Sequence, residues 1–256
     1  MFAIERLNKI KEKLYKEKRV DVFELSELFS VTEVTIRRDL DKLEQQGFLV
    51  KIYGGAVLND ELVQSPTYTE PEDKSIEEKR MIGKIAAQMI ENGDAIYLSS
   101  GTTALEIARN LKDKKLTVVT NDLMIAYGLK DSLGVKVIVT GGDLIKSTST
   151  LVGGFALQAL SGININKAFV GVKGVHMDSG YTVDSYEEVM LIEAVKRISN
   201  EIIVVADYSK FNCTGFARLG DLLMAKKVIT NKQIPSDFKK YYFENAVKLF
   251  TTFEFE

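Results

Sequence analysis

The sequence predicts a two-part α/β protein: a small helical N-terminal domain that ends in a β-hairpin, and a larger domain with a mostly parallel sheet. Three observations predict this division. Residues 1–58 show helical periodicity and then a glycine-marked hairpin pattern. Residues 59–75 contain two of the chain's three prolines and no periodicity, as a linker does. In residues 76–256, apolar strand-like runs alternate with amphipathic helical segments, which is the pattern of a parallel sheet.

Composition limits the classes of function. The net charge of −2 over 256 residues gives no overall attraction for nucleic acid, so any such site must be local. One cysteine and one histidine exclude an internal disulfide and the usual zinc clusters, and we expect neither a metal nor a cofactor. No apolar run approaches the roughly 18 residues of a membrane span, and Met1 leads directly into a charged helical pattern. We therefore expect a cytoplasmic protein with no membrane contact.

The N-terminal domain is expected to contain three helices. The apolar residues at helical spacing are Ile4, Leu7, Ile10 and Leu14 in the first; Val22, Leu25, Leu28 and Phe29 in the second; and Ile36, Leu40 and Leu43 in the third. Asp21 is placed to cap the second helix, and Gly47 to end the third in a left-handed conformation. The short break at residues 30–32 is the connection that a helix-turn-helix uses.

The third predicted helix carries a polar face near its start. A step of about 100° per residue puts Thr35, Arg37 and Arg38 away from the apolar stripe. From this position, side chains of a helix in the major groove reach bases and phosphates. Alternatively, the arginines only solvate an exposed face, pairing with Glu33 or Asp41. The combination of three helices, a tight turn, an arginine pair and a hairpin favours DNA binding.

Residues 48–58, FLVKIYGGAVL, predict a strand, a turn at Gly54-Gly55 and a second strand, which together form a wing beside the helices. Lys51 and Tyr53 lie two residues apart, so we expect them to share one face of the first strand. The candidate DNA contacts are Thr32, Thr35, Arg37, Arg38, Lys51 and Tyr53.

In the second domain we expect strands at 94–99, 116–120, 135–140, 167–172 and 201–206, with helices between them. Ligands of parallel sheets bind beyond the carboxyl ends of the strands. The residues there are mostly small, hydroxyl, amide or charged: Ser99, Ser100, Gly101, Thr102, Thr103, Thr120, Asn121, Gly141, Gly142, Lys173, Gly174, Asp207 and Lys210. Together they predict a crevice rich in hydrogen-bond donors, suited to a phosphorylated sugar.

The segment YLSSGTTALEIARN, residues 97–110, is the sharpest of these signals. It joins an apolar strand to a helix through Ser-Ser-Gly-Thr-Thr, as an anion-binding turn at a helix N-terminus would. Each signal also has a plainer interpretation. Thr102 could only cap its helix, Gly141 and Gly142 could only form a turn, and Lys210 could be an ordinary surface lysine. The shared chemistry of five strand ends favours a binding site.

Two sets of motifs resemble one protein family. TIRRDLDKLEQQG and the GGA of the hairpin resemble the winged helix-turn-helix of the DeoR-type repressors of sugar metabolism. SSGTT, LTVVTND, VTGGDL, AFVGVKGV and VVADYSKFN, within residues 76–230, resemble the effector-binding half of the same repressors. That half is similar in fold to ribose-5-phosphate isomerase and to glucosamine-phosphate deaminase-type enzymes.

The resemblance implies roles for individual residues. It implies that Thr35, Arg37 and Arg38 face operator DNA. In the second domain, it implies that the loop 101–103 grips phosphate, and that Lys210 contributes a charge. It also implies that two residues line the sugar: Thr120 and Asn121.

The chain departs from the family pattern at three places. Tyr53 stands where many members have histidine, and Ser99 where an acid is usual. One helix of the family often carries an E-x-K pattern, and in this chain that stretch reads Met-Leu-Ile at 190–192. The charged residues of the pattern would then be replaced by Glu193 or Lys196, or be absent. Ser99 is the departure that bears on the identity of the effector.

The alternative is a sugar-phosphate isomerase or deaminase-like enzyme with an appended DNA-binding domain. Enolisation of a sugar needs a general base, often a carboxylate supported by a second acid or a histidine. After the fourth strand the sequence offers only His176 and Asp178, and Asp178 is typical of a turn. We therefore expect no catalysis. We expect a homodimer or homotetramer on DNA, and the tail YYFENAVKLFTTFEF to pack on the domain or to form an oligomer contact.

Overall fold

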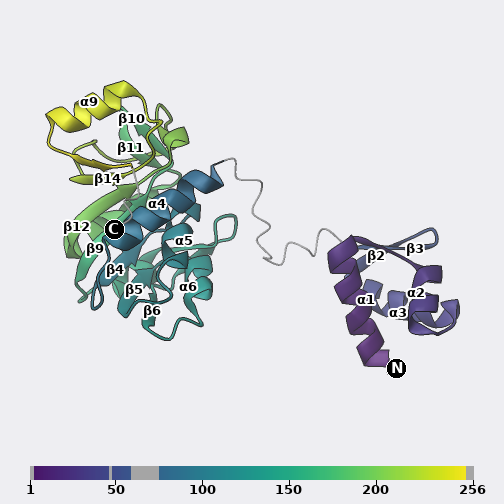
Figure 1. The fold of residues 1–256 in the computed structure, drawn as a ribbon. Coiled ribbons are helices and arrows are strands. Elements are labelled where there is room, and N and C mark those ends of the chain that lie inside the picture. The colour runs from purple at the N-terminus through teal and green to yellow at the C-terminus, as the bar shows by residue number, and fades with distance from the viewer. Residues whose placement is uncertain (1–2, 46–47, 59–74, 252–256) are drawn as a thin grey trace. The chain divides into compact units, whose positions relative to one another are not determined.

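The computed structural model describes residues 3–45, 48–58 and 75–251, which form two compact units (Figure 1). Gly47, expected to end the third helix, lies outside the described residues, as does the expected linker except for Ser75. Each unit has its own hydrophobic core.

The N-terminal unit consists of three helices and a small antiparallel sheet. The helices are α1 (Ala3–Glu17), α2 (Val22–Phe29) and α3 (Glu33–Gln45). The sheet has the order β1 (Arg19–Asp21), β3 (Gly55–Leu58) and β2 (Leu49–Ile52). The strand β1 was not predicted, because three residues between two helices carry no alternation that could be recognised.

Local chemistry sets the ends of the helices. The Asp21 carboxylate accepts hydrogen bonds from the N–H groups of Phe23 and Glu24, which confirms it as the cap of α2. Ser30 ends α2 in the left-handed region, with φ 52°. Most residues of the predicted stripes are buried: Ile10, Leu14, Val22, Leu25, Ile36, Leu40 and Leu43. Leu7 and Phe29 are partly buried, and the side chain of Ile4 lies outside the described part of the chain. Leu28 is the one error, because it is 61% exposed. It lies at the edge of the α2 stripe, where α1 and α3 do not cover it.

The hairpin turn lies one residue earlier than predicted. Ile52 pairs with Gly55, so the turn consists of Tyr53 and Gly54, and Gly54 has a φ of 82°. Gly55 belongs to β3, where a Cβ atom would come within 2.1 Å of the Val20 carbonyl oxygen. The glycine at 55 is therefore needed for β1 to pair with β3, and Tyr53 does not share a strand face with Lys51.

The C-terminal unit is built on a seven-stranded sheet in which all neighbouring strands are parallel. The order is β15 (Lys248–Phe250), β14 (Lys227–Ile229), β12 (Ser199–Val205), β9 (Ile165–Gly171), β4 (Ala95–Leu98), β5 (Leu116–Thr120) and β6 (Val135–Val139). The five predicted strands are confirmed, and β14 and β15 extend the sheet beyond them.

Helices cover both faces of this sheet. One core contains residues of α4 (Ile76–Gln88), α5 (Thr102–Arg109) and α6 (Leu123–Leu129), and the other contains residues of α7 (Gly154–Ala159), α8 (Tyr186–Ile198) and α9 (Ser236–Glu244). Along β4 the side chains alternate, with Ile96 and Leu98 in the first core and Tyr97 in the second. The predicted α/β architecture is therefore the one observed.

Two small antiparallel sheets complete the unit. They are formed by β7 (Asp143–Ile145) with β8 (Thr150–Val152), and by β10 (Gly174–His176), β11 (Gly180–Val183) and β13 (Ala217–Gly220). The described part of the C-terminal tail packs on the domain: Tyr242 of α9 is fully buried and β15 pairs with β14.

Candidate functional site

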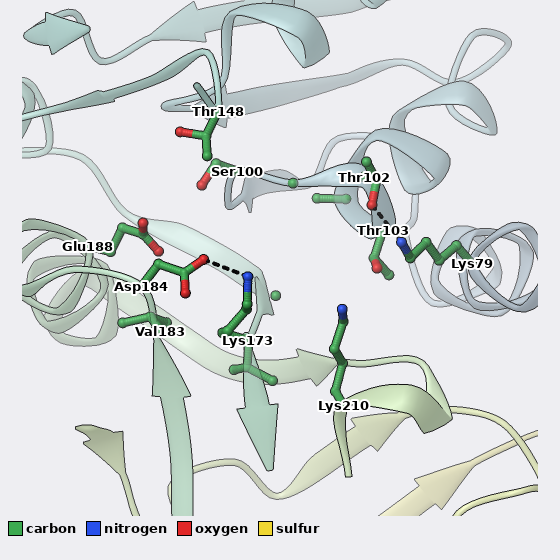
Figure 2. Close-up of a pocket in the computed structure, with 14 residues that line it drawn as sticks. Lys79, Ser100, Thr102, Thr103, Thr148, Lys173, Val183, Asp184, Glu188 and Lys210 are labelled. Carbon is green, nitrogen blue, oxygen red and sulfur yellow. Dashed lines mark hydrogen bonds and ion pairs between the residues drawn. The ribbon is translucent and has the colours of Figure 1, made fainter. Parts of the chain in front are cut away.

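A pocket of about 170 Å³ opens at the carboxyl ends of β4 and β9 (Figure 2). The chain runs from β4 through β5 to β6 in one direction across the sheet, whereas β9 and β12 lie on the other side of β4. Loops that leave β4 and β9 therefore diverge, and such a split is where parallel sheets bind ligands. The lining residues are Lys79, Ser100, Gly101, Thr102, Thr103, Ala104, Thr148, Gly171, Val172, Lys173, Val183, Asp184, Glu188 and Lys210.

The first wall of the pocket is the N-terminus of α5. Leu105 is the first residue whose N–H bonds within the helix, to the Gly101 carbonyl oxygen at 3.0 Å. The N–H groups of Thr102, Thr103 and Ala104 precede it, and such groups have no acceptor inside the helix. Gly101 caps the helix with a φ of 119°, a value that side-chain-bearing residues rarely adopt. Thr102 is the first helical residue, so the alternative in which it caps α5 is wrong.

One N–H group of the loop is already used. The Gly101 N–H donates to the Asp122 carboxylate at 3.0 Å, and the same carboxylate caps α6. Burial raises the pKa of Asp122, while its hydrogen bonds from backbone N–H groups act in the opposite direction. Asp122 therefore holds the loop in place through the Gly101 N–H, and the backbone N–H groups that remain for a ligand are those after Gly101.

Three ammonium groups come from three different elements and point toward the same space (Figure 2). Lys79 belongs to α4 and donates to Thr102 Oγ1 at 2.9 Å. Lys173 follows β9 and pairs with Asp184 at 3.1 Å. Lys210 ends a single 3₁₀ turn and, within the described residues, has no carboxylate partner. These charges make the pocket attractive to an anion.

Two carboxylates also line the pocket, which corrects the expectation that acids are missing there. Asp184 and Glu188 precede and begin α8, beside the Ser185 hydroxyl that caps it. Burial, followed by the charge of Asp184, raises the pKa of Glu188. These acids were not predicted, because they follow a strand of a small sheet and not one of the parallel sheet. The cap pattern Ser-Tyr-Glu-Glu at 185–188 is the signal in the sequence that marks their position.

A second cavity of about 20 Å³ adjoins the pocket and shares Ser100, Gly171 and Glu188 with it. Tyr97, Ser99 and Asn121 also line it. The Ser99 hydroxyl accepts from the Gly171 N–H at 2.8 Å and so joins the ends of β4 and β9. The Tyr97 hydroxyl donates to Asn121 Oδ1 at 2.8 Å, and burial raises the pKa of Tyr97. This cavity is the polar inner end of the site.

Of the predicted effector residues, Ser100, Gly101, Thr102, Thr103, Lys173 and Lys210 line the pocket, and Ser99 and Asn121 line the inner cavity. The other five lie elsewhere. They are Thr120, which accepts from the Asp122 N–H; Gly141 and Gly142, which form a left-handed turn; Gly174, packed on Cys213; and Asp207, which caps the 3₁₀ turn. Their proximity to strand ends reflects structural roles.

The two residues weighed for catalysis are also outside the pocket. His176 ends β10, and its Nδ1 accepts from the Asp178 N–H at 3.2 Å. The Asp178 side chain is 93% exposed, as expected of a turn residue. In the helix with the altered charge pattern, Glu193 and Lys196 pair with each other at 2.6 Å and do not line the pocket.

The candidate DNA-binding surface is the start of α3. The Thr32 hydroxyl lies 3.0 Å from the Thr35 hydroxyl and accepts from the Thr35 N–H at 3.4 Å. Arg37 and Arg38 are both exposed, but Arg37 pairs with Glu33 at 3.1 Å, as the alternative interpretation had it. The described residues show no such partner for Arg38.

The two predicted wing contacts differ in character. Lys51 pairs with Asp41 at 2.5 Å and Glu44 at 3.2 Å, and these hydrogen bonds raise its pKa. Its charge is therefore largely compensated by α3. Tyr53 is fully exposed at the tip of the turn.

One buried ion pair that the sequence did not reveal holds α3 in place. Arg6 Nε of α1 donates to Asp39 Oδ2 of α3 at 2.6 Å, and both side chains are less than a tenth exposed. Asp39 is buried together with Ile36 and Leu43, so it lies on the side of α3 that faces the core. The pair fixes the orientation of α3 against α1.

Within the described ranges, no group of three or more His, Cys, Asp or Glu side chains could hold a metal ion. No helix in the same ranges has the length and apolar character that crossing a bilayer requires.

Comparisons with known proteins place the chain in a family. The model of the DeoR-like helix-turn-helix domain matches residues 6–62, and that of the DeoR C terminal sensor domain matches residues 74–232. A putative aga operon transcriptional repressor of Escherichia coli O157:H7 is 35% identical, over 91% of this chain and 88% of that protein. The transcriptional repressor GlcR of Bacillus subtilis is 31% identical, over 98% and 97%. The glycerol-3-phosphate regulon repressor of Escherichia coli K12 is 29% identical, over 97% and 99%.

Solved structures are more distant. A probable sor operon regulator of Shigella flexneri has 13% identity and a TM-score of 0.42, over 68% of this chain and 90% of that one. Ribose 5-phosphate isomerase A of Methanocaldococcus jannaschii has 15% identity and a TM-score of 0.39, over 54% and 55%. The matches to both domain models and to full-length relatives decide the assignment: the chain belongs to the DeoR family of helix-turn-helix transcriptional regulators.

Proposed function

We propose that this protein represses genes of sugar metabolism and that a phosphorylated sugar, bound in the pocket of the C-terminal unit, sets its affinity for operator DNA. Residues 1–58 would bind DNA, residues 76–256 would bind the effector, and residues 59–75 would join them. The observation that carries the proposal is that Lys79, Lys173 and Lys210 line one pocket together with the N-terminus of α5. Cations together with unpaired helix N–H groups form a site for a phosphate.

The size and polarity of the pocket support a small metabolite. Its volume of about 170 Å³ is below the roughly 300–1,000 Å³ of pockets for drug-sized ligands. A phosphate at the loop 101–103 would leave the rest of the ligand facing Asp184 and Glu188, whose oxygens accept hydrogen bonds from sugar hydroxyls. The inner cavity with Ser99 and Asn121 would distinguish one sugar from another.

The DNA-binding half of the proposal rests on the exposed start of α3. Thr35, Arg37 and Arg38 are directed away from the core that holds Ile36 and Leu40. A single winged unit makes a small interface with DNA, so we propose that a homodimer or homotetramer presents several copies to a symmetric operator.

An isomerase-like activity is the second candidate, and one observation favours it. Glu188 combines a raised pKa with a place in the anion-binding pocket, as a general base for a carbon acid would. Membership in a family of transcriptional regulators supports the first candidate instead. The two functions differ in a direct test, because only an enzyme converts its ligand.

The test is a thermal-shift panel of pentose and hexose monophosphates, with the unphosphorylated sugars as matched controls. We expect at least one monophosphate to raise the melting temperature of the C-terminal unit and the corresponding free sugar to have no effect. The stabilising compound should then change binding to a DNA duplex that the full-length chain selects from a random pool. Turnover of that compound would favour the enzyme, and the absence of any stabilising monophosphate would refute the effector site.

A further inference from the structure

We propose that Lys79 is both a ligand of the effector's phosphate and the residue that transmits effector binding to the segment leading to the DNA-binding unit. This inference rests on the proposed function and adds to it a route of communication. Lys79 is placed for both roles because it belongs to the first turn of α4, the helix that begins where the segment 59–75 ends.

The contacts of Lys79 connect that turn to the anion-binding loop. Its ammonium group lies 2.9 Å from Thr102 Oγ1 and lines the pocket, and only 6% of the residue is exposed. Its own N–H bonds the Ser75 carbonyl oxygen at 3.0 Å, so backbone and side chain join Ser75 to Thr102 through one residue. A phosphate on the Thr102 N–H group would therefore lie within reach of the Lys79 charge.

Electrostatics give Lys79 a reason to respond to the ligand. A cation in the first turn of a helix faces the positive end of the helix dipole, which is unfavourable. The start of α5, with a second positive dipole end, lies on the other side of the same ammonium group. An anion bound at the Thr102 N–H group would add an attraction to the Lys79 ammonium group and to the start of α5. Binding therefore stabilises this arrangement of the first turn of α4 over others, which is the difference in affinity that regulation requires.

A second contact brings the Lys210 side of the pocket to the same turn. Asn231 Nδ2 donates to the Glu78 carbonyl oxygen at 3.2 Å, and Asn231 Oδ1 accepts from the Tyr208 N–H at 3.0 Å. The 3₁₀ turn that starts at Tyr208 ends at Lys210. Asn231 thus joins the turn that carries Lys210 to Glu78, the residue before Lys79.

The rest of α4 is held too closely to move with its first turn. At Gly83, a Cβ atom would come within 2.6 Å of the Glu106 carbonyl oxygen, so α4 and α5 pack with their backbones almost in contact. The core residues Ile82 and Ile85 are buried on the same helix. A change caused by the ligand is therefore confined to the turn before Gly83, next to the start of the connecting segment.

The test uses the full-length chain, the DNA duplex selected by the wild type, and two kinds of probe: inorganic phosphate and the stabilising sugar monophosphate. The variants are Lys79→Met, Lys79→Arg and Lys210→Met. Lys84→Met is the matched control, because Lys84 is an exposed lysine of the same helix that does not line the pocket. Affinity for each probe and the change in DNA affinity at saturating sugar monophosphate are measured separately.

We expect Lys79→Met and Lys210→Met each to weaken phosphate binding about tenfold, the loss of one charge-assisted contact. At saturation, Lys210→Met should reach the full wild-type change in DNA affinity, whereas Lys79→Met should show less than about a third of it. Lys79→Arg should keep most of the response and Lys84→Met all of it. If Lys79→Met does not fold, Lys79→Gln replaces it.

Two results would overturn the role of Lys79 while leaving the proposed function intact. One is a saturated Lys79→Met chain that responds as fully as the wild type. The other is wild-type affinity of this variant for inorganic phosphate. A wild-type chain that binds no monophosphate would be a different failure, since it would remove the effector site itself.

Discussion

The carboxylate of Asp122 accepts a hydrogen bond from the Gly101 N–H at 3.0 Å while it caps α6 through the N–H groups of Met124 and Ile125. One side chain thus holds the starts of two helices on neighbouring connections, after β4 and after β5. The conformation of the loop after β4 is therefore set without a ligand, which under the proposed function lowers the entropy cost of binding the phosphate.

Asp122→Ala should therefore destabilise the C-terminal unit by about 2–3 kcal/mol. The change removes the cap of α6 and leaves the Gly101 N–H without its charged acceptor. Asp122→Asn keeps an oxygen acceptor and should cost about 1 kcal/mol or less. Urea denaturation followed by circular dichroism measures both, and equal losses in the two variants would contradict the capping role.

Arg38→Ala should weaken operator binding more than Arg37→Ala. Arg37 is already paired with Glu33, so it gives up a contact when it reaches DNA, whereas the described residues hold no acid against Arg38. We expect a loss of at least about tenfold for Arg38→Ala, the size of one or more base or phosphate contacts.

Fluorescence anisotropy at several salt concentrations checks this difference. Lys42→Ala, an exposed change farther along α3, serves as the control and should have a smaller effect. The stabilisation by the sugar monophosphate should be unchanged in the arginine variants. Unchanged DNA affinity in Arg38→Ala would show that α3 does not enter the groove as proposed.

Asp39→Ala should unfold the N-terminal unit readily, with a loss of about 3–5 kcal/mol. The change leaves the buried Arg6 guanidinium without its partner, which costs much more than the loss of an exposed pair. Glu17→Ala, which breaks the exposed pair with Lys13, is the matched control and should cost less than about 1 kcal/mol. Chemical denaturation of the full chain, with DNA binding as a second readout, separates the two cases.

The stability difference between the wild type and Glu188→Gln should depend on pH. Burial raises the pKa of Glu188 above its ordinary value of 4.5, so the folded chain holds this proton more tightly than the unfolded chain. The resulting stabilisation is fully present below about pH 4.5 and is lost as the pH rises through the raised pKa. Glutamine does not titrate and lacks this dependence.

Melting temperatures of both chains between about pH 4 and pH 8 measure this effect. The wild type should lose stability relative to Glu188→Gln as the pH increases. A difference that stays constant, or that grows in favour of the wild type, would mean that the Glu188 carboxylate is not penalised by burial. Under the proposed function, Glu188→Gln should also weaken the binding of the sugar monophosphate more than the binding of inorganic phosphate. The reason is that only the sugar monophosphate carries sugar hydroxyls that can donate to the Glu188 carboxylate.

Much of the fold could be predicted from the sequence because its signals are local. The strands β4, β5, β9 and β12 contain apolar runs buried within the sheet, and β6 is a mostly apolar run at its edge. Such runs stand out between amphipathic helices. The strands β14 and β15 were missed because three residues each are too short to show a pattern. Their place in the sheet depends on the pairing of β14 with β12 and of β15 with β14, which are long-range contacts.

The site was predicted only where its residues follow the strands of the parallel sheet. Thr102 and Lys210 met that rule, whereas Lys79 lies on a helix and Glu188 follows a strand of a separate small sheet. Conversely, Gly174 and Asp207 also follow strands of the parallel sheet but do not line the pocket. Gly174 packs against Cys213, and Asp207 caps the 3₁₀ turn. Periodicity predicts which face of a helix or strand a side chain occupies. The residues that surround it in space depend on how the elements are arranged, which periodicity does not give.

The split between β4 and β9 has a consequence for how such proteins diversify. The pocket is assembled from the start of α4 and short segments of five connections, while the two cores lie on the faces of the sheet behind it. Under the proposed function, substitutions at Thr148 or Asp184 would alter the preferred metabolite without repacking either core. Regulators of unrelated nutrients can therefore arise from one scaffold by a few replacements at the rim, each tolerated by a fold whose stability resides elsewhere.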